Sequence, residues 1–143
     1  MTKYVIYVDG SCRGNKNGGI GVLWLKNGKL VQEYFKGFKN VTNNIMELIA
    51  IYVALRSILK PIDYLEIVSD SEYSIGVLAM GWNFKKNIKL INKIKEQLEK
   101  TQKLVKEPIK WTHVRGHQKD NSESTKWNNR VDFLAQNASS YEV

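Results

Sequence analysis

The chain has 143 residues, the usual length of one domain. Hydrophobic residues make up 43% and charged residues 25%, values normal for a packed core, which excludes an intrinsically disordered protein. The single cysteine excludes a disulfide within the chain, and the longest apolar run, Leu48 to Leu55, is far shorter than the roughly 18 residues that span a bilayer. Twenty-two Lys and Arg against 14 Asp and Glu give a net charge of +8, which favours an acidic partner such as nucleic acid.

The N-terminal part of the chain predicts three strands. Residues 3–9 are rich in β-branched and aromatic side chains and run into Asp9-Gly10, which opens a Gly- and Asn-rich turn. Residues 19–26 and 30–37 form the second and third predicted strands. The Asn-Gly pair at 27–28 between them is typical of an antiparallel hairpin.

A helix is predicted next, running to about Leu59 and ended by Pro61. Its N-cap is one of three polar residues, Thr42, Asn43 or Asn44. Apolar positions cover more than half of its circumference, so this helix should be well buried. Residues 64–69 then form a fourth predicted strand.

The C-terminal half predicts three helices and one strand. A short helix starts at 70 or 71 and ends near 80, and a longer amphipathic helix covers 87–105. Residues 109–114 form a fifth strand, 115–126 a polar loop, and 127–140 a final helix.

The resulting order of elements is β-β-β-α-β-α-α-β-α. An antiparallel hairpin extends a sheet whose later strands are joined by helical crossovers. The sequence therefore predicts an α/β fold with a five-stranded mixed sheet and helices on both faces, in a single domain over residues 1–143.

Four acids stand where they could share one pocket: Asp9, Glu47, Asp70 and Asp132. Asp9 and Asp70 each end a predicted strand, and ligands of open α/β sheets collect outside the carboxyl ends of strands. Glu47 lies among apolar residues, where a carboxylate needs a partner or a metal. Taken singly, the four acids have alternatives: a turn, an ion pair with lysine, a helix cap, and a favourable place at a helix N-terminus.

These alternatives do not explain why four acids should converge. Oxygen ligands select hard cations such as Mg²⁺ or Mn²⁺. One Cys and two His disfavour a zinc site of the usual kind. The basic charge is also local, because residues 85–110 contain nine Lys and three Glu. From charge alone, a phosphate-binding stripe and a solvated helix face are equal alternatives.

The chain resembles type 1 ribonuclease H over about residues 3–138. Five segments carry the resemblance, in the right order and at compatible spacing: Tyr7–Cys12, Thr42–Leu48, Ser69–Tyr73, His113–His117 and Asn128–Ala135. The resemblance implies the ribonuclease H fold and a metal-dependent endonuclease that hydrolyses the RNA strand of RNA–DNA hybrids, leaving 5′-phosphate and 3′-hydroxyl ends.

The resemblance also implies residue roles. The four acids fall on the metal-binding positions of the family, which holds two Mg²⁺ ions, with Mn²⁺ as a substitute. His117 falls on its mobile catalytic histidine. The groove that reads 2′-hydroxyls would be lined by Cys12, Gly14, Asn15, Asn43 and Asn44, and a DNA-strand phosphate would be bound by Thr42 and Asn87. Turn and cap chemistry is an equally weighted alternative for these residues.

Two segments depart from the family pattern. Fifteen positions separate His117 from Asp132, so we expect a long, mobile loop between them. An extra basic helix of many relatives is mostly lacking. Further contacts with the hybrid would come instead from residues that follow the short helix: Trp82, Phe84, Lys85, Lys86 and Lys89. Either aromatic side chain could also belong to the core.

Two other functions compete with this interpretation. One is a DNA-directed nuclease of the same superfamily, against which the Asn-rich groove residues argue. The other is a non-catalytic nucleic-acid-binding domain, against which the presence of all four acids argues. The apolar stretch before Asp9 is too short for a signal peptide, so we expect a cytoplasmic monomer without a membrane segment.

Overall fold

The structure is a computed structural model that describes residues 1–116 and 119–139. Its elements follow the predicted order: β1 (Lys3–Cys12), β2 (Gly18–Lys26), β3 (Lys29–Phe38), α1 (Asn43–Arg56), β4 (Tyr64–Ser69), α2 (Glu72–Ala79), α3 (Ile88–Gln102), β5 (Lys110–His113) and α4 (Glu123–Ser139). In the described part, no helix combines the length and the apolar character needed to cross a bilayer.

The five strands form one mixed sheet in the order β3-β2-β1-β4-β5. β2 pairs antiparallel with both β1 and β3, whereas β1 runs parallel to β4 and β4 parallel to β5. The predicted antiparallel hairpin and the helical crossovers are therefore confirmed.

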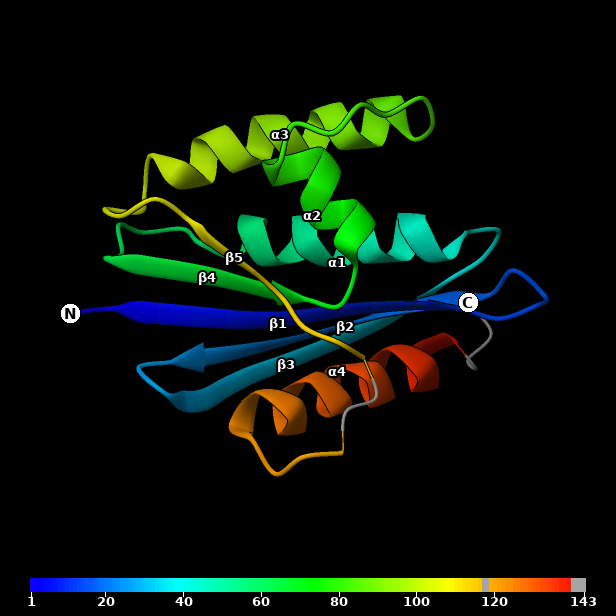
Figure 1. Cartoon of the computed structure of the whole chain (residues 1–143), viewed down its shortest axis with the longest axis horizontal. Helices are drawn as coiled ribbons and strands as arrows, with labels where there is room; N and C mark the ends of the chain where they lie inside the picture. Colours follow the sequence, from blue (N-terminus) through cyan, green and yellow to red (C-terminus); the bar gives the residue numbers. More distant parts are fainter. Residues whose placement is uncertain (117–118, 140–143) are drawn as a thin grey trace.

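Helices cover both faces of the sheet, as predicted. In Figure 1, α1, α2 and α3 lie on one side of the sheet and α4 lies on the other. The larger hydrophobic core fills the first side and contains Ile6, Leu48 and Ile67, all fully buried. A smaller cluster that includes Leu23 and Val131 lies on the side of α4. The two helix layers thus hold the central strands from opposite faces.

Glycines let the two central helices come close to the sheet. A side chain at Gly10 of β1 would collide with the backbone of Met46 and Glu47 in α1. A side chain at Gly21 of β2 would collide with the carbonyl of Val131 in α4. Because both contacts are backbone against sheet, they fix how far each helix stands from β1 and β2.

α1 ends earlier than the sequence indicates. It ends at Arg56 and not near Leu59, so Pro61 is not the residue that terminates it. The hydroxyl of Ser57, the C-cap residue, donates to the Ala54 carbonyl at 2.6 Å and accepts from the Trp24 indole at 2.7 Å. The tertiary contact to β2 therefore ends the helix before the proline does.

α4 starts earlier than the sequence indicates. Its first residue is Glu123, so residues 123–126 of the predicted loop are helical. The Ser122 hydroxyl accepts from the amide of Thr125 at 3.1 Å, and Asp120 accepts from the amide of Ser122 at 3.0 Å. This polar first turn has no apolar period, so the sequence pattern predicts a loop there; the cap residue Ser122 is the feature that could have indicated the earlier start.

Candidate active site

Asp9 and Asp70 reach the same edge of the sheet by different routes. The parallel pairing of β1 with β4 ends at Tyr7 and Val68, while β1 continues beside β2 as far as Cys12. Asp9 was predicted to end its strand, but it lies within β1, just beyond the part that β4 covers. Asp70 follows directly after β4. Two acids from neighbouring parallel strands therefore stand side by side.

Glu47 joins them from α1, at the point where that helix touches Gly10. Asp9, Glu47 and Asp70 each offer a carboxylate oxygen, and these oxygens lie within 4.8 Å of one another. Asp9 is only 2% exposed and Glu47 9%. The Oε2 atom of Glu47 is buried and has no hydrogen-bond partner among the residues that the structure describes. The three carboxylates form a cluster, which we call the carboxylate cluster.

Asp132 adjoins the carboxylate cluster from α4. The sequence placed it in the first turns of the last helix, but the early start of α4 puts it well inside the helix. Stabilisation by a helix N-terminus falls off within the first turn, so this alternative no longer accounts for Asp132. Its carboxylate accepts from the Gln136 amide at 3.1 and 3.2 Å, and its interaction with Asp9 contributes to the raised pKa of that residue.

The electrostatics of the cluster favour a bound cation. Burial raises the pKa of Asp9, and the negative charges of Glu47 and Asp70 raise it further. Burial also raises the pKa of Glu47, followed by the charge of Asp70, while hydrogen bonds from Asp9 and the Gly10 backbone act in the opposite direction. Carboxylates this close repel one another unless a proton or a cation lies between them.

A hard divalent cation fits these residues. The donors are all carboxylate oxygens, which suit Mg²⁺ or Mn²⁺. The unpartnered, buried Oε2 of Glu47 is a ligand atom that no described protein group satisfies. Structural ion pairing does not explain Glu47, because no lysine or arginine forms a salt bridge with it in the described ranges.

The comparisons with known proteins identify the family. The family model for RNase H matches residues 1–140. The chain belongs to the ribonuclease H family. Ribonuclease H of Clostridium botulinum is 41% identical over 150 residues, and the alignment covers 96% of each chain.

Solved ribonuclease H structures share the fold. LC11-RNase H1, solved in complex with an RNA/DNA hybrid, superposes with a TM-score of 0.74 at 22% identity and covers 95% of this chain and 96% of its own. RNase H1 from Halobacterium salinarum gives 0.73 at 23% identity, with 95% and 96% covered. The type 1 ribonuclease H resemblance and the predicted fold are thereby confirmed.

The predicted groove residues lie on two segments of the chain that meet. The Cys12 thiol donates to the Val41 carbonyl at 3.2 Å, and the Val41 amide donates to the Lys16 carbonyl at 3.2 Å. These contacts hold the β1–β2 turn, with Gly14 and Asn15, against the start of α1, where Asn43 and Asn44 are exposed. The structure brings the two predicted parts of the groove together.

Turn and cap chemistry also occurs among these predicted groove residues. The Thr42 hydroxyl accepts from the Ile45 amide at 3.2 Å and so caps α1. The side chain of Asn15 accepts from the Asn17 amide at 3.0 Å within the turn. Asn87 differs, because it precedes α3 with φ of 58° and its side chain makes no cap hydrogen bond. The side-chain amide of Asn87 therefore remains available to bind a ligand at the start of α3.

The segment before α3 carries both packing and exposed charge. Trp82 packs on Gly76 of α2 and is 40% exposed. Phe84 is half-buried against the larger core, with the Lys95 ammonium 5.0 Å from its ring centre. Phe84 therefore belongs to the core, whereas Trp82 keeps a surface that a ligand can reach. Lys85, Lys86 and Lys89 are exposed.

His117 lies outside the described residues, so its catalytic role stays a prediction. Three further residues touch the acids or their supports and were not predicted from the sequence. A ring nitrogen of His113 lies 3.2 Å from the Asp70 carbonyl, and Gln136 holds Asp132. Arg13 donates to the Ser139 hydroxyl at 3.1 Å, which ties the β1–β2 turn to α4. The spacing of four between Asp132 and Gln136 on one helix face could have indicated the second contact.

Proposed function

We propose that this ribonuclease H is an endoribonuclease that hydrolyses the RNA strand of RNA–DNA hybrids and leaves 5′-phosphate and 3′-hydroxyl ends. The convergence of Asp9, Glu47 and Asp70 on one small volume carries the proposal. A relative of the same fold is bound to an RNA/DNA hybrid, which supports the choice of substrate. Hydrolysis of a phosphodiester with a metal-binding set of acids is the chemistry that such a site can perform.

Four acids would hold two divalent ions, Mg²⁺ or in its place Mn²⁺. Asp9, at the centre of the group, would serve both ions, Glu47 and Asp70 would hold one, and Asp132 would hold the other. Bound there, the ions would lower the pKa of the attacking water and stabilise charge on the leaving oxygen. His117 would accept or relay a proton on the leaving side.

The protein's own contribution is to hold the acids in place. Glu47 is only 9% exposed and lies where the backbone of α1 touches Gly10, which holds its carboxylate beside Asp9. His113 contacts the backbone of Asp70, and Gln136 orients Asp132. Mutation of residues that support metal ligands in this way typically lowers metal affinity or activity about 10–100-fold.

Two further surfaces would select and bind the hybrid. The groove between the β1–β2 turn and the start of α1 offers amide and backbone groups that both donate and accept, which suits 2′-hydroxyls. Thr42 and Asn87 would contact a DNA-strand phosphate. Lys85, Lys86 and Lys89, with the exposed ring of Trp82, would supply the rest of the backbone contacts.

Cleavage of a labelled hybrid, set beside duplex DNA and duplex RNA, tests the proposal. We expect cleavage of the RNA strand only, in the presence of Mg²⁺, and none with a chelator. Asp70→Asn should abolish cleavage while hybrid binding stays within about threefold, because lysines supply most of the affinity. Glu96→Gln, an exposed acid on α3, removes the same charge and should cleave at the normal rate.

Each other outcome contradicts part of the proposal. Cleavage of duplex DNA would favour a DNA-directed nuclease of the same superfamily. Binding without cleavage at any divalent ion concentration would favour a non-catalytic binding domain. An Asp70→Asn variant that cuts at the normal rate would reject the assigned acids.

We also propose that residues 1–143 act as one catalytic domain and as a monomer. All four acids come from one chain and from elements that pack on a single sheet. Light scattering after gel filtration should give one mass near 16.5 kDa that does not change with concentration. A dimer that dissociates only with loss of activity would contradict this.

A further inference from the structure

A cavity lies at the end of the sheet opposite the carboxylate cluster. It has a volume of about 320 Å³ and opens between the start of β1, the β2–β3 hairpin and the chain that follows α1. Tyr4 on its wall and Asp9 lie on the same strand, five residues apart, so about 17 Å separates them. The volume falls at the lower end of cavities that bind small molecules, about 300–1,000 Å³. Because of the distance along β1, the cavity is separate from the carboxylate cluster.

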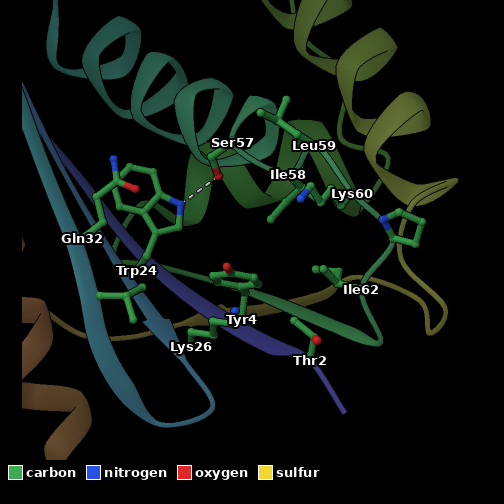
Figure 2. Close-up of a pocket in the computed structure, with 12 residues that line it drawn as sticks. Thr2, Tyr4, Trp24, Lys26, Gln32, Ser57, Ile58, Leu59, Lys60 and Ile62 are labelled. Carbon is green, nitrogen blue, oxygen red and sulfur yellow. Dashed lines mark hydrogen bonds between the residues drawn. The ribbon is translucent and has the colours of Figure 1, made fainter.

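The walls of this cavity are held in place before any ligand arrives. Trp24 is only 4% exposed, and its indole donates to the Ser57 hydroxyl at 2.7 Å. Ile62 is 9% exposed, and its amide donates to the Leu104 carbonyl at 2.8 Å. Figure 2 shows the Tyr4 ring lying between Trp24 and Ile62, with Ile58 opposite it. A flat apolar group would meet the half-buried ring of Tyr4 first, with the buried side chains of Trp24 and Ile62 beside it.

The charged side chains that line the cavity have one sign. Lys26 approaches from β2 and Lys60 from the segment after α1, so cations come from both walls (Figure 2). Among the described residues, no acidic side chain lines the cavity. Neither lysine forms a salt bridge within residues 1–116 and 119–139. An anion beside the apolar group would therefore find two available donors. The carboxylate of Asp63 lies outside the lining and accepts from the amide of the lining residue Thr2 at 2.7 Å.

We propose that this cavity is a binding site for a small aromatic carboxylate, whose ring packs against Trp24 and Tyr4 and whose anion is held by Lys26 and Lys60. The proposal does not depend on nuclease activity. Because the cavity and the carboxylate cluster lie at opposite ends of β1, the ligand should leave metal binding unchanged.

Nuclear magnetic resonance of the full chain labelled with ¹⁵N and titrated with naphthoate tests the site. The chain has four tryptophans, and Trp24 is the member of this set whose side chain lines the cavity. We expect its indole signal to shift and saturate, while the indole signals of Trp82, Trp111 and Trp127 stay in place. Naphthamide, which has the same ring without the charge, should bind at least about fivefold more weakly, as expected for the loss of charge-assisted hydrogen bonds at an exposed rim.

Matched variants assign the contacts. The double change Lys26→Ala and Lys60→Ala removes exposed side chains, so folding should be unaffected, and naphthoate affinity should fall at least about fivefold. The double change Lys100→Ala and Lys110→Ala removes the same charge from exposed positions elsewhere and should leave affinity unchanged. The proposal is overturned by an unsaturable Trp24 shift, by equal affinity for naphthamide, or by equal loss in both double variants.

Discussion

Glu47 lies close to Asp9 because Gly10, the residue that follows Asp9 in β1, has no side chain to hold α1 away. The backbone of α1 at Glu47 occupies the volume that a Cβ at Gly10 would fill, and the Gly10 amide donates to the Asp9 carboxylate at 2.9 Å. Gly10 thus sets both the distance of α1 from β1 and the spacing between Asp9 and Glu47.

A methyl group at Gly10 should therefore disturb stability and site together. We expect Gly10→Ala to lower the free energy of unfolding by about 1–3 kcal/mol through overpacking and to weaken Mn²⁺ binding measured by calorimetry. Gly14→Ala, where nothing lies within 4 Å of an added Cβ, should keep the normal stability. Equal unfolding midpoints of the two variants in urea would contradict the close seat of α1.

The raised pKa values predict how stability depends on pH without metal. The pKa of Glu47 rises from 4.5 to about 8, mainly through burial, and that of Asp9 rises in the same direction. The folded state then binds more protons than the unfolded state, so the contribution of Glu47 to stability is greatest below pH 4.5 and is lost as pH rises toward 8. The contribution of Asp9, whose pKa rises to about 11, declines over a window that extends further into alkaline pH. Melting temperatures measured in chelator should fall across this window.

Two controls separate this effect from general titration. Glu47→Gln should flatten the pH dependence, because the amide does not ionise. Saturating Mg²⁺ should restore stability most at the high end of the window, where the carboxylates are charged. A melting temperature in chelator that rises from pH 4.5 to pH 8 would reject the mutual repulsion of these acids.

The lysines before and within the start of α3 predict a salt effect on hybrid binding. Replacing Lys85, Lys86 and Lys89 by alanine should weaken binding and reduce the slope of log affinity against log salt by about one for each phosphate that the variant no longer binds. The charge-matched change of Lys26, Lys29 and Lys60, at the opposite end of the sheet, should leave the slope unaltered. Fluorescence anisotropy over a salt series measures the affinity and the slope of each variant. Identical slopes for the two triple variants would contradict a contact between the start of α3 and the hybrid.

The Trp24–Ser57 hydrogen bond makes a prediction for stability. Ser57→Ala leaves the buried indole N–H without its acceptor and should cost about 1–3 kcal/mol of unfolding free energy. In a double-mutant cycle with Trp24→Phe, part of this loss should vanish, since the donor is then gone as well. Additive losses in urea unfolding would show that the two side chains do not depend on each other.

Much of the fold could be predicted because local patterns and tertiary packing agree. The β-branched run of β1, the Asn-Gly hairpin and the buried face of α1 each have one clear interpretation, and the order of elements follows from them. The errors fall where tertiary contacts override local signals. Trp24 sets the end of α1 through Ser57, and a polar turn capped by Ser122 starts α4 before any apolar residue marks it.

The candidate site was predictable in its residues more than in its geometry. Asp9 and Asp70 were expected together because parallel strands end at one edge, and the carboxylate oxygens of both do lie in one cluster with Glu47. The position of Asp132 inside α4 was not expected, since it depends on where that helix begins. The contact of Gln136 with Asp132 was not predicted, although their spacing of four within the predicted helix 127–140 is compatible with it.

The opposed glycines Gly10 and Gly21 have one more consequence. Gly10 faces Ile20 and Gly21 faces Asp9 across the same strand pair, so the two helices press on neighbouring points of the sheet from opposite sides. Main-chain contacts at Gly10 and Gly21 therefore help to set the gap between the acids of α1 and α4. We expect substitutions among aliphatic residues far from these two glycines to change the melting temperature more than the spacing of the acids.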